Sequence, residues 1–266
     1  MISVFLTVSD AAKDALIAEL WEAGTTGITE ENGALRAFFE DGLDASELER
    51  LFAEYNPHVT AEENRDWVKD CQAYWEPFAV GERFFLVPEW RDDEAPDGRI
   101  RLTTFPGMAC GTGIHPATQL CLIAMEHHLQ AGESLLDVGT GTGILAHGAL
   151  LLGAKRVVAC DIEQEAAVIA RHNFEKTGAA IGVFAGSLKS VKSSAFDAAV
   201  ANLNAATLHM LAADLCRVSA RLIVSGFREN EMDRVKSSIG AGVSDALTMD
   251  GWACLVFRSM SLPPFF

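Results

Sequence analysis

Paired cysteines and long apolar runs are the first features that this sequence lacks. None of its six cysteines forms a Cys-x-x-Cys pair, which disfavours both a disulfide framework and a cysteine-rich zinc site. No apolar stretch reaches the length that a membrane-spanning helix needs. Residues 1–8 are mostly apolar, but no basic residues precede them and Ser9 and Asp10 follow, so we expect no signal peptide. These absences predict a cytoplasmic chain without a membrane partner.

Positive charge is also scarce. Lys and Arg number 21 against 37 Asp and Glu, which gives a net charge of −16. Residues 1–70 alone carry 16 acidic and 5 basic side chains. Nucleic-acid-binding proteins usually carry the opposite charge because they neutralise phosphates, so we expect no direct nucleic-acid binding. The acidic front either serves solubility or attracts a basic macromolecule, and charge alone does not decide between these interpretations.

Residues 1–62 alternate between strand and helix patterns. Apolar residues recur with period two from Ile2 to Val8, and from Leu16 to Trp21 they recur with helical spacing. Asn32-Gly33 is a strong hairpin signal. The expected strands are 2–8, 28–30, 34–39 and 58–62, with helices near 16–21 and after 44. This βαββαβ order is typical of a small ferredoxin-like α+β domain, a fold that more often binds than catalyses.

Residues 63–105 look like a connector between two domains. Trp67 to Trp75 place apolar residues at helical spacing, which is more typical of packing than of ligand contact. Phe84–Val87 and Ile100–Phe105 have strand character and flank a polar loop.

From residue 106 to 266, strand patterns alternate with helix patterns. This alternation predicts a doubly wound, mostly parallel, seven-stranded Rossmann-like α/β sheet. An Asp250-Gly251 turn signal joins the last two strands, and a hairpin there would leave one antiparallel strand in the sheet. The expected strands are 135–138, 157–160, 181–184, 198–201, 222–224, 243–247 and 254–257, with helices at 144–152, 165–176 and 207–215.

A glycine-rich turn lies at the end of the first of these strands, in Asp137-Val138-Gly139-Thr140-Gly141-Thr142-Gly143. Glycines at alternate positions let the backbone turn tightly and approach a bulky ligand. A dinucleotide fingerprint would need glycine at 144, where Ile144 stands, and no Gly-Lys-Ser/Thr follows. The turn therefore favours a nucleoside ligand without a pyrophosphate.

Two of the other expected strands, 157–160 and 198–201, are each followed directly by a polar residue. Asp161 follows Val157-Val158-Ala159-Cys160, where a carboxylate can accept both ribose hydroxyls; its alternative role is to cap the next helix. Asn202 ends the strand that begins near Phe196 and can orient an incoming nucleophile, or it too can cap a helix.

A loop rich in small residues, 107–118, precedes a helix that ends near Leu129. Such a loop can close against a ligand, and Thr118 is placed to hydrogen-bond it. His115 is either a general base or a structural residue. The remaining histidines show no metal-ligand spacing, so we expect no metal site.

These stretches together resemble the PrmA family, which methylates the eleventh protein of the large ribosomal subunit. The glycine motif is common to many methyltransferases, whereas 77–90 and 111–118 are more specific to the family. The sequence departs from the family's pattern at Cys110, Ala117, His147 and Asn204. The matching stretches are 77–90, 111–118, 136–146, 201–203 and 222–226.

The resemblance implies a methyltransferase that uses S-adenosyl-L-methionine and releases S-adenosyl-L-homocysteine. It also implies that the front domain captures a basic ribosomal protein, whose lysine side-chain and N-terminal amines receive methyl groups. Asn202 is the expected catalytic residue, without a dedicated base. The alternatives are a methyltransferase for another protein or a small molecule, a non-catalytic nucleoside-binding module, and an NAD enzyme. The expected cofactor contacts are Thr112, Thr118, Asp137, Gly139, Gly141, Gly143, Asp161 and Asn202.

Overall fold

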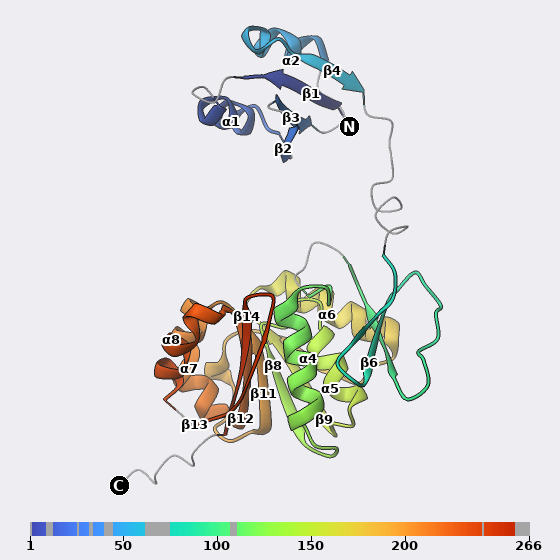
Figure 1. Cartoon of the computed structure of the whole chain (residues 1–266), viewed down its shortest axis with the longest axis vertical. Helices are drawn as coiled ribbons and strands as arrows, with labels where there is room; N and C mark the ends of the chain where they lie inside the picture. The colour runs from blue at the N-terminus through green and yellow to red at the C-terminus, as the bar shows by residue number, and fades with distance from the viewer. Residues whose placement is uncertain are drawn as a thin grey trace. The chain divides into compact units, whose positions relative to one another are not determined.

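The computed structural model describes residues 2–8, 13–25, 27–31, 34–39, 45–61, 75–106, 111–240 and 242–258. By their contacts the residues divide into two compact units, Met1–Tyr74 and Trp75–Phe266 (Figure 1). The helical stripe from Trp67, the Asn32-Gly33 turn and Cys110 lie outside the described residues. Within those ranges, no helix combines the length and the apolar character that crossing a bilayer requires.

The first unit contains the six elements expected from the sequence, in the expected order. Its four strands form an antiparallel sheet in the order β2-β3-β1-β4. Alternate residues of β1 and β3, such as Leu6 and Phe39, are buried against Leu16 and Leu20 of the first helix. The elements are β1 (Ile2–Thr7), α1 (Lys13–Glu22), β2 (Gly27–Glu31), β3 (Ala34–Phe39), α2 (Ala45–Leu51), the 3-10 turn η1 (Ala53–Tyr55) and β4 (His58–Ala61).

The second unit is built on a seven-stranded sheet in the order β10-β9-β8-β11-β12-β14-β13. Neighbours from β10 to β12 are parallel, while β14 is antiparallel to both β12 and β13. The expected single antiparallel strand is thus confirmed. The strands are β8 (Ser134–Val138), β9 (Arg156–Asp161), β10 (Gly182–Ala185), β11 (Phe196–Asn202), β12 (Ser219–Arg228), β13 (Gly242–Met249) and β14 (Trp252–Arg258).

Helices cover both faces of this sheet (Figure 1). Because side chains alternate along a strand, Leu135 packs with α4, α5 and α6 on one face, and Leu136 packs with α7 and α8 on the other. All five residues of β8 are buried, as expected for a central parallel strand. The helices are α4 (Pro116–His128), α5 (Ile144–Leu151), α6 (Gln164–Thr177), α7 (Ala205–Val218) and α8 (Met232–Ile239), with 3-10 turns η2 (Leu188–Ser190) and η3 (Glu229–Glu231).

Residues 75–105 belong by their contacts to the second unit. The sequence pattern predicts instead a connector over residues 63–105. In the structure, residues 75–105 form a three-stranded sheet of β5 (Phe78–Val80), β6 (Phe84–Pro88) and β7 (Ile100–Thr104), in which β6 and β7 are parallel. Phe84, Leu86 and Leu102 are fully buried in the same core as α5. The two predicted strands are confirmed, and they form an extra layer on the α5 side.

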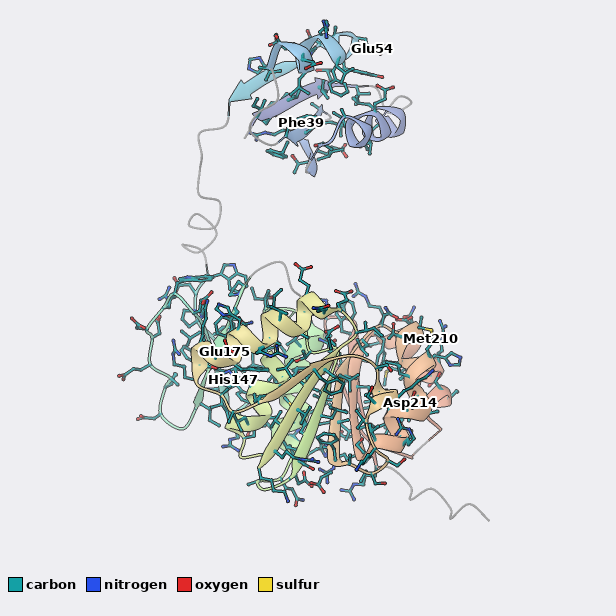
Figure 2. All side chains as sticks on the ribbon, turned by 180° about the vertical axis from the view of Figure 1, so that it is seen from behind. Phe39, Glu54, His147, Glu175, Met210 and Asp214 are labelled. Carbon is teal, nitrogen blue, oxygen red and sulfur yellow. The ribbon has the colours of Figure 1, made fainter. Side chains whose placement is uncertain are left out.

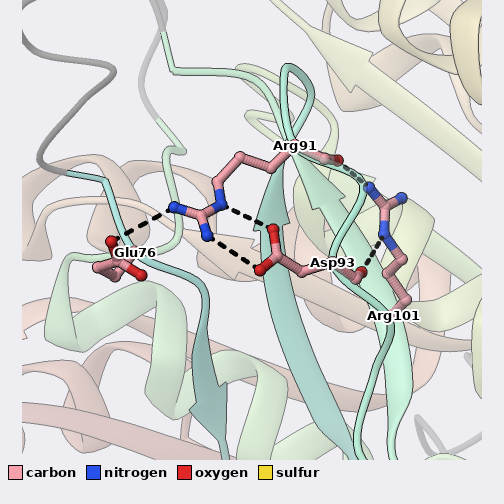
Figure 3. A network of polar contacts seen from close by, with 4 residues as sticks. All are labelled: Glu76, Arg91, Asp93 and Arg101. Carbon is pink, nitrogen blue, oxygen red and sulfur yellow. Dashed lines mark hydrogen bonds and ion pairs between the residues drawn. The ribbon is translucent and has the colours of Figure 1, made fainter.

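An arginine network holds the polar loop between β6 and β7 (Figure 3). The Arg91 guanidinium donates to both carboxylate oxygens of Asp93, at 2.7 and 2.9 Å, and it also reaches Glu76. This hydrogen bond lowers the pKa of Asp93. Arg101 donates to the backbone carbonyls of Asp93 and Arg91 from the neighbouring strand. The loop is therefore tied to β7 at Arg91 and Asp93.

Strand β12 has an irregularity beside the end of β11. Its register with β14 shifts between Ser225 and Phe227, and Gly226 between them has a φ of +96°. A Cβ at Gly226 would lie 2.6–2.8 Å from backbone atoms of Leu203. Glycine is thus required for Leu203, the residue after Asn202, to lie against β12 at this point.

We expect Gly226→Ala to destabilise the second unit far more than Gly178→Ala does. Both positions have positive φ, which costs an alanine about 1–2 kcal/mol. Gly178 has no atom near its hypothetical Cβ, whereas overpacking at Gly226 adds about 1–3 kcal/mol. Urea denaturation of both variants measures the difference, and equal losses would contradict the crowding at Leu203.

Candidate active site

The turn after β8 carries the three motif glycines and leads into α5. Gly139, Gly141 and Gly143 all have positive φ, and Gly143 is the N-terminal cap of α5. A Cβ at Gly139 would lie 2.6 Å from Cδ2 of Leu203. The glycine therefore permits a close approach between this turn and the loop after β11.

Four of the predicted residues line one cavity of about 640 Å³ at the carboxyl edge of the sheet: Gly139, Gly141, Asp161 and Asn202. A smaller cavity of about 110 Å³ shares Gly139 and Asp161 with it. The lining of this smaller cavity is mainly apolar and includes Val138, Ile162, Leu188 and Leu211. The two cavities offer an apolar slot beside a carboxylate, which suits a nucleoside whose ring system is apolar and whose sugar is polar.

Asp161 ends β9 and is held by two backbone groups. Its Oδ2 accepts the Gly141 N–H at 3.1 Å, and its Oδ1 accepts the Glu163 N–H at 3.1 Å. The N-terminal cap of α6 is Glu163, so Asp161 is not the cap residue of that helix. The carboxylate is oriented toward the glycine turn and keeps lone pairs for a ligand.

Asn202 ends β11 and is oriented by Thr118 of α4. Its Nδ2 donates to Thr118 Oγ1 at 3.1 Å, which joins two segments 84 residues apart. Asn204, not Asn202, caps α7, since its Oδ1 accepts the Thr207 N–H at 2.8 Å. With its amide nitrogen directed to Thr118, Asn202 is left with Oδ1 as an acceptor.

His115 has a structural role at the start of α4. It is the N-terminal cap, and its Nδ1 accepts the Ala117 N–H at 3.2 Å. Its ring lies edge-on to Trp252 at 4.4 Å, and the Arg228 guanidinium covers Trp252 at 4.1 Å. Burial, and then the charge of Arg228, lower the pKa of His115. The imidazole is therefore held neutral and fixed in orientation.

Asp137 lies fully buried behind the glycine turn. Its Oδ2 accepts from the Thr140 hydroxyl at 2.7 Å and from the Ala146 N–H at 3.1 Å. Its Oδ1 has no hydrogen-bond partner among the residues that the structure describes. Burial raises the pKa of Asp137 to about 6, against the two hydrogen bonds, which lower it. An orphaned buried acceptor of this kind is costly to stability.

Thr112, Thr118, Asp137 and Gly143 line neither cavity. Thr112 follows Gly111, whose carbonyl accepts from the Thr142 hydroxyl at 2.6 Å, so its loop lies on the glycine turn. None of the apolar lining residues is predicted from the sequence. For Ile162, which the structure leaves 78% exposed, the one available sequence signal is its position directly after Asp161.

We expect Asp137→Asn to remove a pH-dependent loss of stability. Because the carboxyl pKa rises from 3.8 to about 6 on folding, the protonated form is favoured in the native state, and stability falls as pH rises from about 4 to 6. Asparagine cannot ionise, so the difference in unfolding free energy between variant and wild type should grow by up to about 3 kcal/mol across this range. Urea denaturation at each pH tests this, with Asp97→Asn as the exposed control. Parallel pH profiles for Asp137→Asn and wild type would contradict it.

Comparisons with known proteins agree with this architecture. A family model described as ribosomal protein L11 methyltransferase (PrmA) matches residues 2–260. A ribosomal protein L11 methyltransferase of Cupriavidus necator is 37% identical over 202 residues, which cover 74% of this chain and 66% of the relative. One from Staphylococcus carnosus is 31% identical over 227 residues, which cover 82% of this chain and 72% of the relative.

A solved structure is also similar. The ribosomal protein L11 methylase of Lactobacillus delbrueckii subsp. bulgaricus matches with a TM-score of 0.63 and 28% identity, covering 70% of this chain and 100% of that one. In the first two curated relatives the match spans just under two thirds of their length, 66% and 65%. Since the family model matches nearly the whole chain, this protein belongs to the ribosomal protein L11 methyltransferase (PrmA) family.

Proposed function

We propose that the protein is an S-adenosyl-L-methionine-dependent methyltransferase that acts on amines of ribosomal protein L11, at lysine side chains, the N-terminus or both. The observation that carries the proposal is the meeting of Asp161 and Asn202 in one cavity beside the glycine turn. Membership of the PrmA family supports the same reaction and substrate. We propose that the reaction takes place in the cytoplasm.

Each part of the cavity suits one part of the cofactor. Asp161 would accept hydrogen bonds from the two ribose hydroxyls, which are stronger than neutral ones because the acceptor is charged. The apolar slot with Ile162 and Leu188 would hold the adenine ring. Gly139 and Gly141 would leave space for the ribose and the amino-acid portion. The other four predicted residues do not line the cavity and would act indirectly, by shaping the glycine turn after β8 and the loop before α4. They are Thr112, Thr118, Asp137 and Gly143.

The cofactor, when bound, supplies a methyl group on a sulfonium whose departure as a neutral thioether needs no acid. The chain's task is then to position an uncharged amine. An ordinary lysine amine has a pKa near ~10.4, and a poorly hydrated site lowers it. With Nδ2 donating to Thr118, Asn202 Oδ1 would accept an N–H of that amine. This hydrogen bond would orient the substrate amine without requiring a dedicated catalytic base.

The first unit is proposed to capture the substrate. Its antiparallel sheet order β2-β3-β1-β4, with two intervening helices, supports a ferredoxin-like domain over residues 1–62 followed by a connector. The excess of acidic residues in this part of the chain would attract a basic ribosomal protein and repel nucleic acid. Exposed acidic residues such as Glu47, Glu49 and Glu54 lie on α2 and η1.

Asp161→Ala should weaken cofactor binding at least tenfold, because the loss of a charged acceptor costs about 1.5–3 kcal/mol. Asn202→Ala should instead lower kcat at least tenfold with little change in cofactor Kd. Calorimetry with S-adenosyl-L-homocysteine and a methylation assay on purified L11, read by mass spectrometry, separate the two effects. Asp233→Asn on α8 is the control, and unchanged affinity of Asp161→Ala would refute the ribose assignment.

Neutralising Glu47, Glu49 and Glu54 together to glutamine should raise KM for L11 at low salt and leave kcat unchanged, because electrostatic attraction acts mainly on encounter. The matched control neutralises Asp97, Glu175 and Asp233, three exposed acids of the second unit. Equal KM values for both triple variants would argue against capture by the front unit. A parallel assay on a lysate with labelled cofactor would reveal a different protein substrate.

A further inference from the structure

The two cavities beside Asp161 together form the proposed cofactor cleft. A second, separate cavity of about 480 Å³ lies within the second unit and shares no lining residue with that cleft. Both involve α6, but at different places. Glu165, Ala166 and Ile169 line the cleft, whereas Lys176 and Thr177 at the other end of the helix line the second cavity. Ile169 and Lys176 are about 10 Å apart along a helix axis. The second cavity is therefore a separate site.

The cations around this cavity already have partners. Lys176 forms an ion pair with Glu89, and its ammonium lies 5.5 Å from the centre of the Phe105 ring. Arg101 donates from Nε and Nη2 to the carbonyls of Asp93 and Arg91 (Figure 3). Its third guanidinium nitrogen, Nη1, donates to the Thr103 hydroxyl. Both cations are therefore already engaged by acceptors of the chain itself.

The groups without partners are acceptors. His147, on α5 near the end of α6 that carries Glu175 (Figure 2), is 8% exposed and lines the cavity. Within the described part of the chain, neither its ring nor the Asp92 carboxylate has a hydrogen-bond or ion-pair partner. Burial lowers the pKa of His147 to about 4, so the ring is neutral at pH 7 and one nitrogen accepts.

Two apolar side chains complete the lining, beside the hydroxyl-bearing Thr103 and Thr177. Leu151 lies one helical turn after His147 on the same face of α5, and Phe105 follows β7. An aromatic face attracts cations, as the position of Lys176 over Phe105 already illustrates. The cavity thus combines a carboxylate, a neutral ring acceptor and apolar surface.

We propose that this cavity is a second binding site, for an alkylammonium ion. In it, His147 and Asp92 accept N–H hydrogen bonds, while Phe105 and Leu151 contact the alkyl chain. Asp92 is exposed and carries a carboxylate without an ion-pair partner among the described residues. An anion would be repelled by it, and a neutral alcohol would form no ion pair with it. The ammonium head is therefore the chemistry that the lining selects. Both a free amine and a lysine side chain carry that head.

The test uses the full-length chain, labelled with ¹⁵N, and follows the His147 ring nitrogens by NMR. Their signals are assigned by their loss in His147→Gln. Titration with n-butylammonium should shift them along a saturable curve, whereas n-butanol and butyrate should not. Asp92→Asn should weaken the n-butylammonium Kd at least fivefold, and Glu94→Gln, an exposed acid two residues away, should leave it unchanged.

Several results would overturn the site: no saturable shift with n-butylammonium, equal or tighter binding of butyrate, or an unchanged Kd in Asp92→Asn. Two further probes identify the source of the ammonium group. Tighter binding of Nα-acetyl-lysine methylamide indicates a protein side chain, and tighter binding of 1,5-diaminopentane indicates a free amine. Because the readout does not involve methyl transfer, failure here leaves the proposed enzymatic function untouched, and the reverse also holds.

Discussion

The candidate site depends on the register of three parallel strands. Val138 of β8 pairs with Cys160 of β9 on one side and with Ala201 of β11 on the other. Gly139, Asp161 and Asn202 are each the next residue along, so backbone hydrogen bonding places them at one edge of the sheet. A shift of one residue in either pairing would turn a side chain to the opposite face and separate the turn, the carboxylate and the amide.

Other features of the second unit serve to hold this edge. Gly226 lets Leu203, the residue after Asn202, lie against β12, the hydrogen bond between Asn202 and Thr118 ties α4 to β11, and His115 begins α4 as its cap. Asp137 receives the Thr140 hydroxyl and the Ala146 N–H, which tie it to the turn and to α5. The same helix carries His147 into the second cavity. The cofactor cleft and the second cavity thus share α6, whose opposite ends line them, while differing in the chemistry that they offer.

Much of the second unit could be predicted because its patterns are local. Strand and helix alternation, the Asp250-Gly251 hairpin and the polar residues at strand ends are all readable along the chain, and the sheet confirms the first two. The layer formed by β5, β6 and β7 was not predicted as part of this unit. The pattern of such short strands does not indicate which part of the chain they pack against. The helix α8 was also missed; it has only two buried residues, Val235 and Ile239.

The sequence by itself determined the family, the class of sheet and the residues at its carboxyl edge, because glycine spacing and apolar periodicity act through local backbone geometry. Only the tertiary structure decided which neighbouring groups each side chain has. It showed that Asn202 donates to Thr118 and that Asp161 does not cap α6. It also showed that Asp137 Oδ1 has no hydrogen-bond partner within the described ranges. It also surrounded His147 with residues from four different segments. Hydrogen bonding and burial depend on residues far apart in the chain, which no local pattern specifies.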